Sequence, residues 1–135
     1  MALITWGDSY SVKVKVIDNQ HQKLVGIINT LHDAMKEGKG KEAIGKVLKE
    51  LVDYTVYHFS FEEKLFDKYG YPDAKIHAKQ HNDLVQSVKK YVSDFESGKG
   101  VLPMEVMNFL RDWLLKHISG DDKKYSPFFN SKGLS

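Results

Sequence analysis

Apolar residues recur at spacings of three and four along four segments of the chain, the spacing of one face of an α-helix. The four apolar faces comprise Leu24, Val25, Ile28, Leu31 and Met35; Val47, Leu51, Tyr54, Leu65 and Phe66; Ala74, Leu84, Val88, Tyr91 and Phe95; and Val106, Leu110, Trp113 and Leu114. Each face is wide enough to bury one side of a helix against neighbours. The pattern therefore predicts four amphipathic helices.

Capping and breaking residues give approximate ends for these helices. Asp18 can cap the first helix, and a glycine pair near residue 40 ends it. The second runs from about Lys41 to near Gly70, Pro72 opens the third, and Pro103 begins the fourth. Short connections place successive helices antiparallel, so we expect an all-α, up-down-up-down antiparallel four-helix bundle.

The first residues follow a different pattern. Val12, Val14 and Val16 alternate with polar residues, which locally resembles a strand, but no second strand signal exists to pair with it. We predict an extended N-terminal arm over residues 1–17, with Trp6 as its anchor. Residues 18–131 would form the bundle and a C-terminal segment, within a single domain spanning 1–135.

Composition narrows the possible functions. The chain has 135 residues, of which 41% are hydrophobic and 28% charged, as in ordinary globular domains. Its net charge of +2 is spread along the chain without a basic stripe, so nucleic acid is not an expected partner. No apolar run approaches the roughly 20 residues of a membrane span, and no signal peptide is visible, so we expect a cytoplasmic protein.

Cysteine is absent from the chain. This excludes disulfides, iron–sulfur clusters, thiolate zinc sites and cysteine nucleophiles. Any metal ion must therefore be held by nitrogen and oxygen atoms.

Five histidines and two carboxylates fall on the predicted helices at spacings that suit a metal site. They are His21 on the first helix, His58 and Glu62 on the second, His77 and His81 on the third, and His117 and Asp122 at the end of the fourth. Residues four apart share a helix face, with Cβ atoms about 5–6 Å apart. Seven ligands exceed the roughly four of a tetrahedral zinc ion but suit two iron ions with shared bridging groups.

Each motif alone has a structural alternative. His21 could be a hydrogen-bonded core residue, and His58 with Glu62 could be a surface pair; together, a cation best explains so many buried ionisable groups. His32 lies three turns from His21, about 16 Å away, and is interpreted as structural or exposed.

Neighbouring carboxylates raise a second question. Glu63 and Asp121, the neighbours of Glu62 and Asp122, are interpreted as pointing away from the cluster. Spacing alone does not choose between Asp121 and Asp122, because Gly120 breaks or bulges the helix there.

Five segments of the chain resemble the hemerythrin family, and in particular the single-domain bacteriohemerythrins. They are residues 17–21 (IDNQH), 58–62 (HFSFE), 77–81 (HAKQH), 113–118 (WLLKHI) and 122–125 (DKKY), and the resemblance extends over nearly the whole chain. Myohemerythrin is itself a standard example of a four-helix bundle, so the expected fold follows from the family as well.

The resemblance implies a role for each ligand. His77, His81 and His117 would ligate one iron ion, and His21 and His58 the other. Glu62 and Asp122 would bridge the two ions together with an oxo or hydroxo group, which favours Asp122 over Asp121. The iron with two histidines would keep an open position for dioxygen. Trp113, Leu114 and Ile118 match the residues that line the family's oxygen pocket.

The function implied is reversible dioxygen binding at a non-haem di-iron centre, for oxygen storage, transport or delivery, without enzymatic turnover. The expected protein is a monomer whose partners are dioxygen and an oxygen-consuming enzyme as recipient. The Glu-x-x-His pattern of ferritin-like di-iron proteins is absent, which argues against a ferroxidase. Two alternatives stay open: a di-iron peroxidase or oxidase, and an oxygen- or redox-sensing module that acts through a partner protein.

Overall fold

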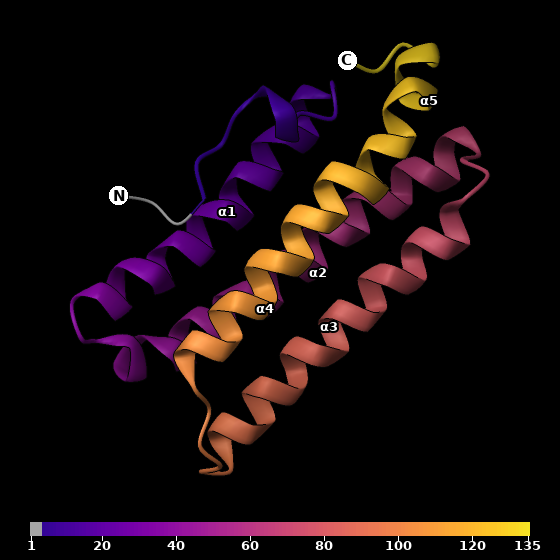
Figure 1. Ribbon diagram of the computed structural model, residues 1–135. Helices are drawn as coiled ribbons and strands as arrows, with labels where there is room; N and C mark the ends of the chain where they lie inside the picture. Colours follow the sequence, from indigo (N-terminus) through magenta and orange to yellow (C-terminus); the bar gives the residue numbers. More distant parts are fainter. Residues whose placement is uncertain (1–3) are drawn as a thin grey trace.

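Four long antiparallel helices make up most of the molecule, as the computed structural model shows for residues 4–135 (Figure 1). They are α1 (Lys15–Lys36), α2 (Gly40–Tyr69), α3 (Ala74–Glu96) and α4 (Pro103–Lys116). A π-helical turn η2 (His117–Asp121), a 3-10 turn η3 (Asp122–Tyr125) and a short helix α5 (Ser126–Ser131) continue α4. The predicted up-down-up-down bundle is confirmed.

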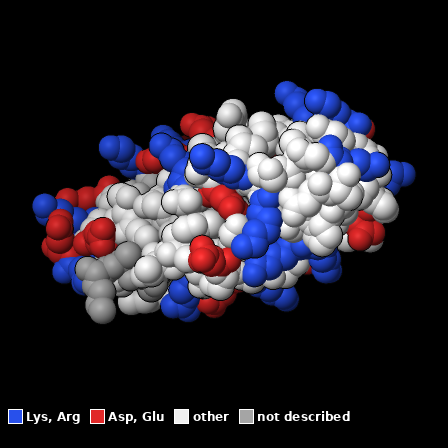
Figure 2. Space-filling model, turned by 90° about the horizontal axis from the view of Figure 1, so that it is seen from above, with Lys and Arg blue, Asp and Glu red and all other residues white. Residues whose placement is uncertain are grey.

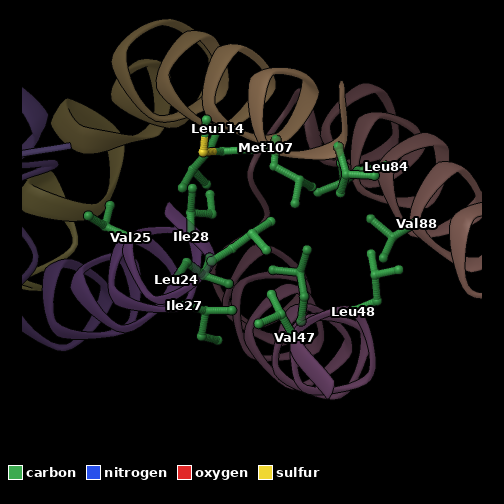
Figure 3. Close-up of a cluster of buried hydrophobic side chains, with 14 of the residues drawn as sticks. Leu24, Val25, Ile27, Ile28, Val47, Leu48, Leu84, Val88, Met107 and Leu114 are labelled. Carbon is green, nitrogen blue, oxygen red and sulfur yellow. The ribbon is translucent and has the colours of Figure 1, made fainter. Parts of the chain in front are cut away.

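The main core lies between α1, α2, α3 and α4. In Figure 3, Leu24 and Ile28 of α1, Leu48 of α2, Val88 of α3 and Leu114 of α4 point inward between the helices. All five side chains are buried. Each fully buried aliphatic side chain contributes roughly 1.5–3 kcal/mol, so this face-to-face burial is what holds the helices together.

A second, smaller cluster closes one end of the bundle, and we call it the end core. It consists of Val12, Val14, Ile17, Phe66, Tyr71, Tyr125 and Phe129. These residues come from the arm, α1, α2, the α2–α3 turn, η3 and α5. The arm is therefore part of the packing of the fold.

An N-terminal arm precedes α1 as expected, but it ends at Val14 rather than at residue 17, and its first three residues lie outside the described part of the chain. The arm contains one 3-10 turn, η1 (Asp8–Tyr10). Asn29 of α1 holds its start, because the side-chain amide accepts from the Ile4 N–H and donates to the Ile4 carbonyl, each over 2.9 Å. Val16, the third residue of the alternating pattern, belongs to α1 and is 44% exposed.

Asp18 does not cap α1, and that expectation is wrong. The helix begins at Lys15, with Val14 as its N-cap residue, so Asp18 lies inside the first turn. Its carboxylate instead accepts hydrogen bonds from the Ser11 hydroxyl at 2.6 Å and the Val12 N–H at 2.8 Å. These hydrogen bonds hold the arm against α1. They account for a carboxylate at position 18 as well as a capping role would.

The turn between α2 and α3 brings an aromatic ring into the end core. Gly70 ends α2 in the left-handed conformation (φ 71°), which favours glycine. The N–H groups of Gly70 and Tyr71 both donate to the Phe66 carbonyl. Pro72 lies in this turn, before α3 begins at Ala74, rather than in the first helical turn as expected.

The surface carries charge of both signs. On the face seen in Figure 2, lysine, arginine, aspartate and glutamate side chains are interspersed among uncharged ones. Within residues 4–135, none of the helices has the length and apolar content needed to cross a membrane.

Candidate metal centre

The seven predicted ligands lie together in a polar layer between the main core and the end core. Their side chains are almost fully buried: His21, His58, Glu62, His77, His81, His117 and Asp122 are each at most 3% exposed. On α1, His21 stands between Ile17 of the end core and Leu24 of the main core. On α2, Glu62 similarly stands between Phe59 and Phe66. These candidate ligands occupy core-facing positions of their helices, which is why helical periodicity pointed to them.

The ligand atoms form two groups that share one carboxylate. One group comprises Glu62, His77, His81, His117 and Asp122, and the other comprises His21, His58 and Glu62. Within each group, one ligand atom of every residue lies within 4.8 Å of the others. We call the histidines of the first group the three-histidine set and those of the second the two-histidine set.

Glu62 contacts both sets through a single oxygen. Its Oε1 lies 3.3 Å from Nε2 of His58 and 3.2 Å from Nε2 of His81. The second oxygen, Oε2, accepts a hydrogen bond from the Tyr125 hydroxyl. Glu62 therefore stands between the two sets, with its orientation fixed from the end core.

Asp122 also contacts both sets, with one oxygen for each. Oδ1 lies 2.7 Å from Nε2 of His77 and 2.9 Å from Nε2 of His117. Oδ2 lies 3.1 Å from Nε2 of His21. Two carboxylates thus connect the three-histidine set to the two-histidine set.

A π-helical turn puts Asp122 rather than Asp121 into this layer. The Asp122 N–H donates to the His117 carbonyl, closing a hydrogen bond across five residues instead of the four of an α-helix. The wider turn aligns residues five apart. Asp121 lies at the edge of the layer, where its 25% exposed side chain approaches Nδ1 of His117 and the Lys124 ammonium.

Several buried polar atoms in the layer lack a hydrogen-bond partner among the described residues. They include Nε2 of His21, Nε2 of His77, Oε1 of Glu62 and both carboxylate oxygens of Asp122. Leaving such atoms unpaired costs about 1–3 kcal/mol each, and more for charged groups. A cation among them would satisfy all of them, so the residues fit a bound metal.

The spacing and chemistry of the donors fit iron. Nε2 of His81 and Nε2 of His117 lie 3.2 Å apart. This separation suits two imidazoles on one ion, because metal–nitrogen bonds of about 2.0–2.1 Å at roughly a right angle place the nitrogens about 3 Å apart. Imidazole and carboxylate donors without thiolate suit iron among the transition metals.

The environment sets the protonation of these groups. Burial lowers the pKa of His58 to about 4, so its ring is neutral at neutral pH. Burial opposes charge on His81, but the adjacent carboxylates of Glu62 and Glu63 raise its pKa to about 9. Burial would also raise the pKa of Asp122, yet the imidazoles around it hold that pKa well below its usual range. Both signs of charge are thus concentrated where a cation would sit.

Three of the histidines, His58, His81 and His117, have a further side chain near Nδ1, the ring nitrogen that faces away from Glu62 and Asp122. Gln20 meets His58 at 2.6 Å, Glu63 meets His81 at 3.1 Å, and Asp121 meets His117 at 3.3 Å. The interpretation of Glu63 and Asp121 as pointing elsewhere was therefore incomplete: each contacts a predicted ligand. Gln20 was missed because a glutamine beside His21 has no periodic signal of its own.

The three predicted pocket residues differ in their surroundings. Leu114 and Ile118 are buried in the main core. Trp113 is partly exposed and stacks on His117, with 4.4 Å between ring centroids and 19° between planes. Phe59, which the sequence reasoning did not single out, stacks on His81 with 3.8 Å between centroids. His32 lies outside both ligand groups and is partly exposed.

Comparisons with known proteins agree with this geometry. The family model for the hemerythrin HHE cation binding domain matches residues 12–129. A bacteriohemerythrin of Pseudomonas paraeruginosa is 42% identical over 125 residues, covering 93% of this chain and 80% of that protein. A bacteriohemerythrin of Methylococcus capsulatus is 38% identical and covers 94% of this chain and 97% of its own length.

Solved structures give the same result. A crystal structure described as wild-type hemerythrin superimposes with a TM-score of 0.86 at 36% identity, covering 93% of this chain and 97% of that one. Sequence, helix arrangement and buried ligand layer all agree: the chain belongs to the hemerythrin family.

Proposed function

We propose that this protein is a dioxygen carrier or store that binds the gas reversibly at a pair of iron ions, in one hemerythrin-like domain. The observation that carries the proposal is the position of the two carboxylates. Glu62 and Asp122 each lie within 3.3 Å of histidines from both sets. Two ions held side by side need such shared ligands.

The seven residues would provide two metal positions. His77, His81 and His117 would hold one ion, His21 and His58 would hold the other, and Glu62 and Asp122 would be shared between the two ions. The pair, when bound, supplies the two electrons of reversible dioxygen binding. The position held by two histidines has one protein donor fewer, which leaves room for an external ligand.

The surrounding side chains favour binding over turnover. Leu114 and Ile118 contribute an apolar wall from α4 and η2, and both are at most 5% exposed. Tyr125 is buried beside the layer, and burial together with Asp122 and Glu62 raises its pKa well above the usual range. Its hydroxyl stays protonated at neutral pH and is a poor general acid–base group. The chain is therefore proposed to work as a binding protein whose dioxygen passes to an oxygen-consuming enzyme.

A sensory role is the second candidate, and the N-terminal arm is the observation in its favour. Trp6 of the arm lies 6.5 Å from the His21 ring, centroid to centroid. A change at the two-histidine position could move this arm and be read by a partner protein. Limited proteolysis of the arm in the reduced and oxidised protein would distinguish the two roles.

The deciding experiment is an anaerobic titration. The purified chain is loaded with ferrous iron, titrated with dioxygen while a ligand-to-iron charge-transfer band is followed, and then purged of gas. We expect two iron ions per chain, one dioxygen per pair, and recovery of the starting spectrum after purging. A single zinc ion per chain would overturn the di-iron assignment, and steady consumption of hydrogen peroxide would favour an enzyme.

A further inference from the structure

The two sets of histidines differ in what contacts their Nδ1 atoms. In the three-histidine set, carboxylates approach these atoms: Glu63 lies 3.1 Å from His81, and Asp121 lies 3.3 Å from His117. In the two-histidine set, a neutral amide does so, from Gln20 to His58. Nδ1 of His21 and Nδ1 of His117 make no hydrogen bond within the described residues, so Asp121 acts on His117 through its charge alone. The charge around the layer is thus uneven.

The Gln20 contact is short and buried. Oε1 of Gln20 lies 2.6 Å from Nδ1 of His58, and the two residues are 7% and 1% exposed. Because an amide oxygen only accepts, the proton of the neutral ring stays on Nδ1. The lone pair of Nε2 is then free and faces Oε1 of Glu62 at 3.3 Å. Gln20 therefore selects the tautomer that can bind a metal.

The same contact fixes the direction of the ring. Gln20 and His58 belong to different helices, α1 and α2, and Gln20 directly precedes His21. Helix α1 thus brings one ligand to the two-histidine position and positions the other. Removal of such an outer hydrogen-bond partner typically lowers metal affinity by 10–100-fold.

A carboxylate beside an imidazole Nδ1 favours metal binding by the ring more strongly than an amide does. A carboxylate that accepts from an imidazole N–H raises the basicity of the ring and adds negative charge near a cation. The Glu63 side chain is 40% exposed and that of Asp121 is 25% exposed, so water screens both in part. Glu63 adds a negative charge near the three-histidine position. Asp121 adds a second one, which the Lys124 ammonium at 3.7 Å compensates in part, whereas Gln20 adds none.

We propose that Gln20 is a positioning residue for His58, and that its neutral amide, set against Glu63 and Asp121, makes the two-histidine position the weaker of the two metal positions. This inference rests on the proposed pair of metal ions. The two positions fill in order, the three-histidine position first.

The test is a titration of the metal-free protein with Co²⁺, a redox-stable probe for nitrogen and oxygen donors. The unaltered chain should show two steps, the first tighter than the second. Gln20→Leu should weaken the second step by about 10–100-fold and leave the first unchanged. Gln20→Glu keeps an oxygen acceptor for His58 and adds a negative charge. It should therefore raise the Co²⁺ affinity of the second step and bring it closer to that of the first. Glu63→Gln should weaken the first step only.

Gln22→Leu is the matched control, since Gln22 is an exposed glutamine on the same helix and should change neither step. The proposal is overturned if Gln20→Leu weakens both steps equally or neither. If Gln20→Leu does not fold, Gln20→Glu decides the question. An unchanged ratio between the Co²⁺ affinities of the two steps in that variant also overturns the proposal. Fewer than two Co²⁺ ions on the unaltered chain would instead remove the proposed di-iron function itself.

Discussion

The Tyr125 hydroxyl donates a hydrogen bond to Oε2 of Glu62, and neither residue is exposed to solvent. The other oxygen of Glu62 faces the histidines, so the tyrosine holds one half of the carboxylate while the other half is left for a metal. Tyr125 also packs in the end core. The orientation of a carboxylate in the polar layer therefore depends on packing outside it.

Tyr125→Phe should destabilise the metal-free protein by about 1–3 kcal/mol, because Oε2 of Glu62 becomes a buried acceptor without a donor. Iron content should remain two per chain. Chemical denaturation of the metal-free variant measures the loss. Tyr71→Phe removes a hydroxyl from the same end core and should change stability by less than about 0.5 kcal/mol. Equal effects of the two changes would contradict a specific role for the Tyr125 contact.

Asp122→Asn should prevent the loading of two metal ions, whereas Asp121→Asn should permit it. Asp122 contacts histidines of both sets, and Asp121 only approaches Nδ1 of His117. An amide in place of Asp122 removes a charge and a bridging oxygen. Metal content after anaerobic loading gives the answer, and two ions in the Asp122→Asn variant would show that this carboxylate is not shared.

Glu62→Ala should abolish the paired site, because Glu62 is the residue common to both ligand groups. His32→Ala is the control, at a histidine that lies outside both ligand groups, and should leave two iron ions per chain. Elemental analysis of both variants after identical purification is sufficient. Equal iron contents in the two variants would show that Glu62 does not bind metal.

The metal-free protein should lose stability between about pH 6.5 and 9. The folded-state pKa of His81 is about 9, above the ordinary 6.5, so its protonated ring stabilises the fold fully below pH 6.5. That stabilisation, about 3 kcal/mol at most, disappears as the pH rises through the folded-state pKa. The metal-loaded protein should melt higher and lack this fall, because metal ions bind the folded chain alone.

Denaturation series at several pH values, with and without metal, measure this effect. The His32→Ala variant should retain the same pH profile. A flat profile for the metal-free protein across this window would show that the ion pairs of His81 with Glu62 and Glu63 do not stabilise it.

Leu114→Ala should shorten the lifetime of the oxygenated protein several-fold while leaving two iron ions bound. Leu114 is 5% exposed and lies one turn before His117, so its truncation opens a cavity that admits water, at a cost of about 2–5 kcal/mol. The decay of the oxygenated absorption band is the measurement. Leu110→Ala, one turn further along the core, should cost similar stability without changing the decay. Identical decay in both variants would place the pocket elsewhere.

Helical periodicity predicted the bundle and placed six of the seven candidate ligands together, because those residues occupy core-facing positions. Periodicity failed where the helix is irregular. It could not separate Asp121 from Asp122, since a π-helical turn aligns residues five apart and leaves no mark in a pattern of three and four. Only the resemblance to a family favoured Asp122 at that stage.

Contacts between helices were the second feature that could not be predicted from the sequence. The pairing of Gln20 with His58 depends on how α1 is rotated against α2, and a single sequence does not record this rotation. The start of α1 was misplaced for a related reason. Asp18 has the chemistry of a capping residue, but its hydrogen bonds go to Ser11 and Val12 of the arm, so the helix extends one turn further back.

The polar layer between the main core and the end core also bears on cooperativity. Small domains unfold as one unit when their apolar contacts are continuous, but here two apolar clusters meet across ionisable groups. Without metal, we expect the end core, with Val12 and Val14 of the arm and with α5, to open while the rest of the bundle stays folded. Metal ions would join the two regions into a single cooperative unit. The backbone amides of the end core should then exchange with solvent much more slowly once metal is bound.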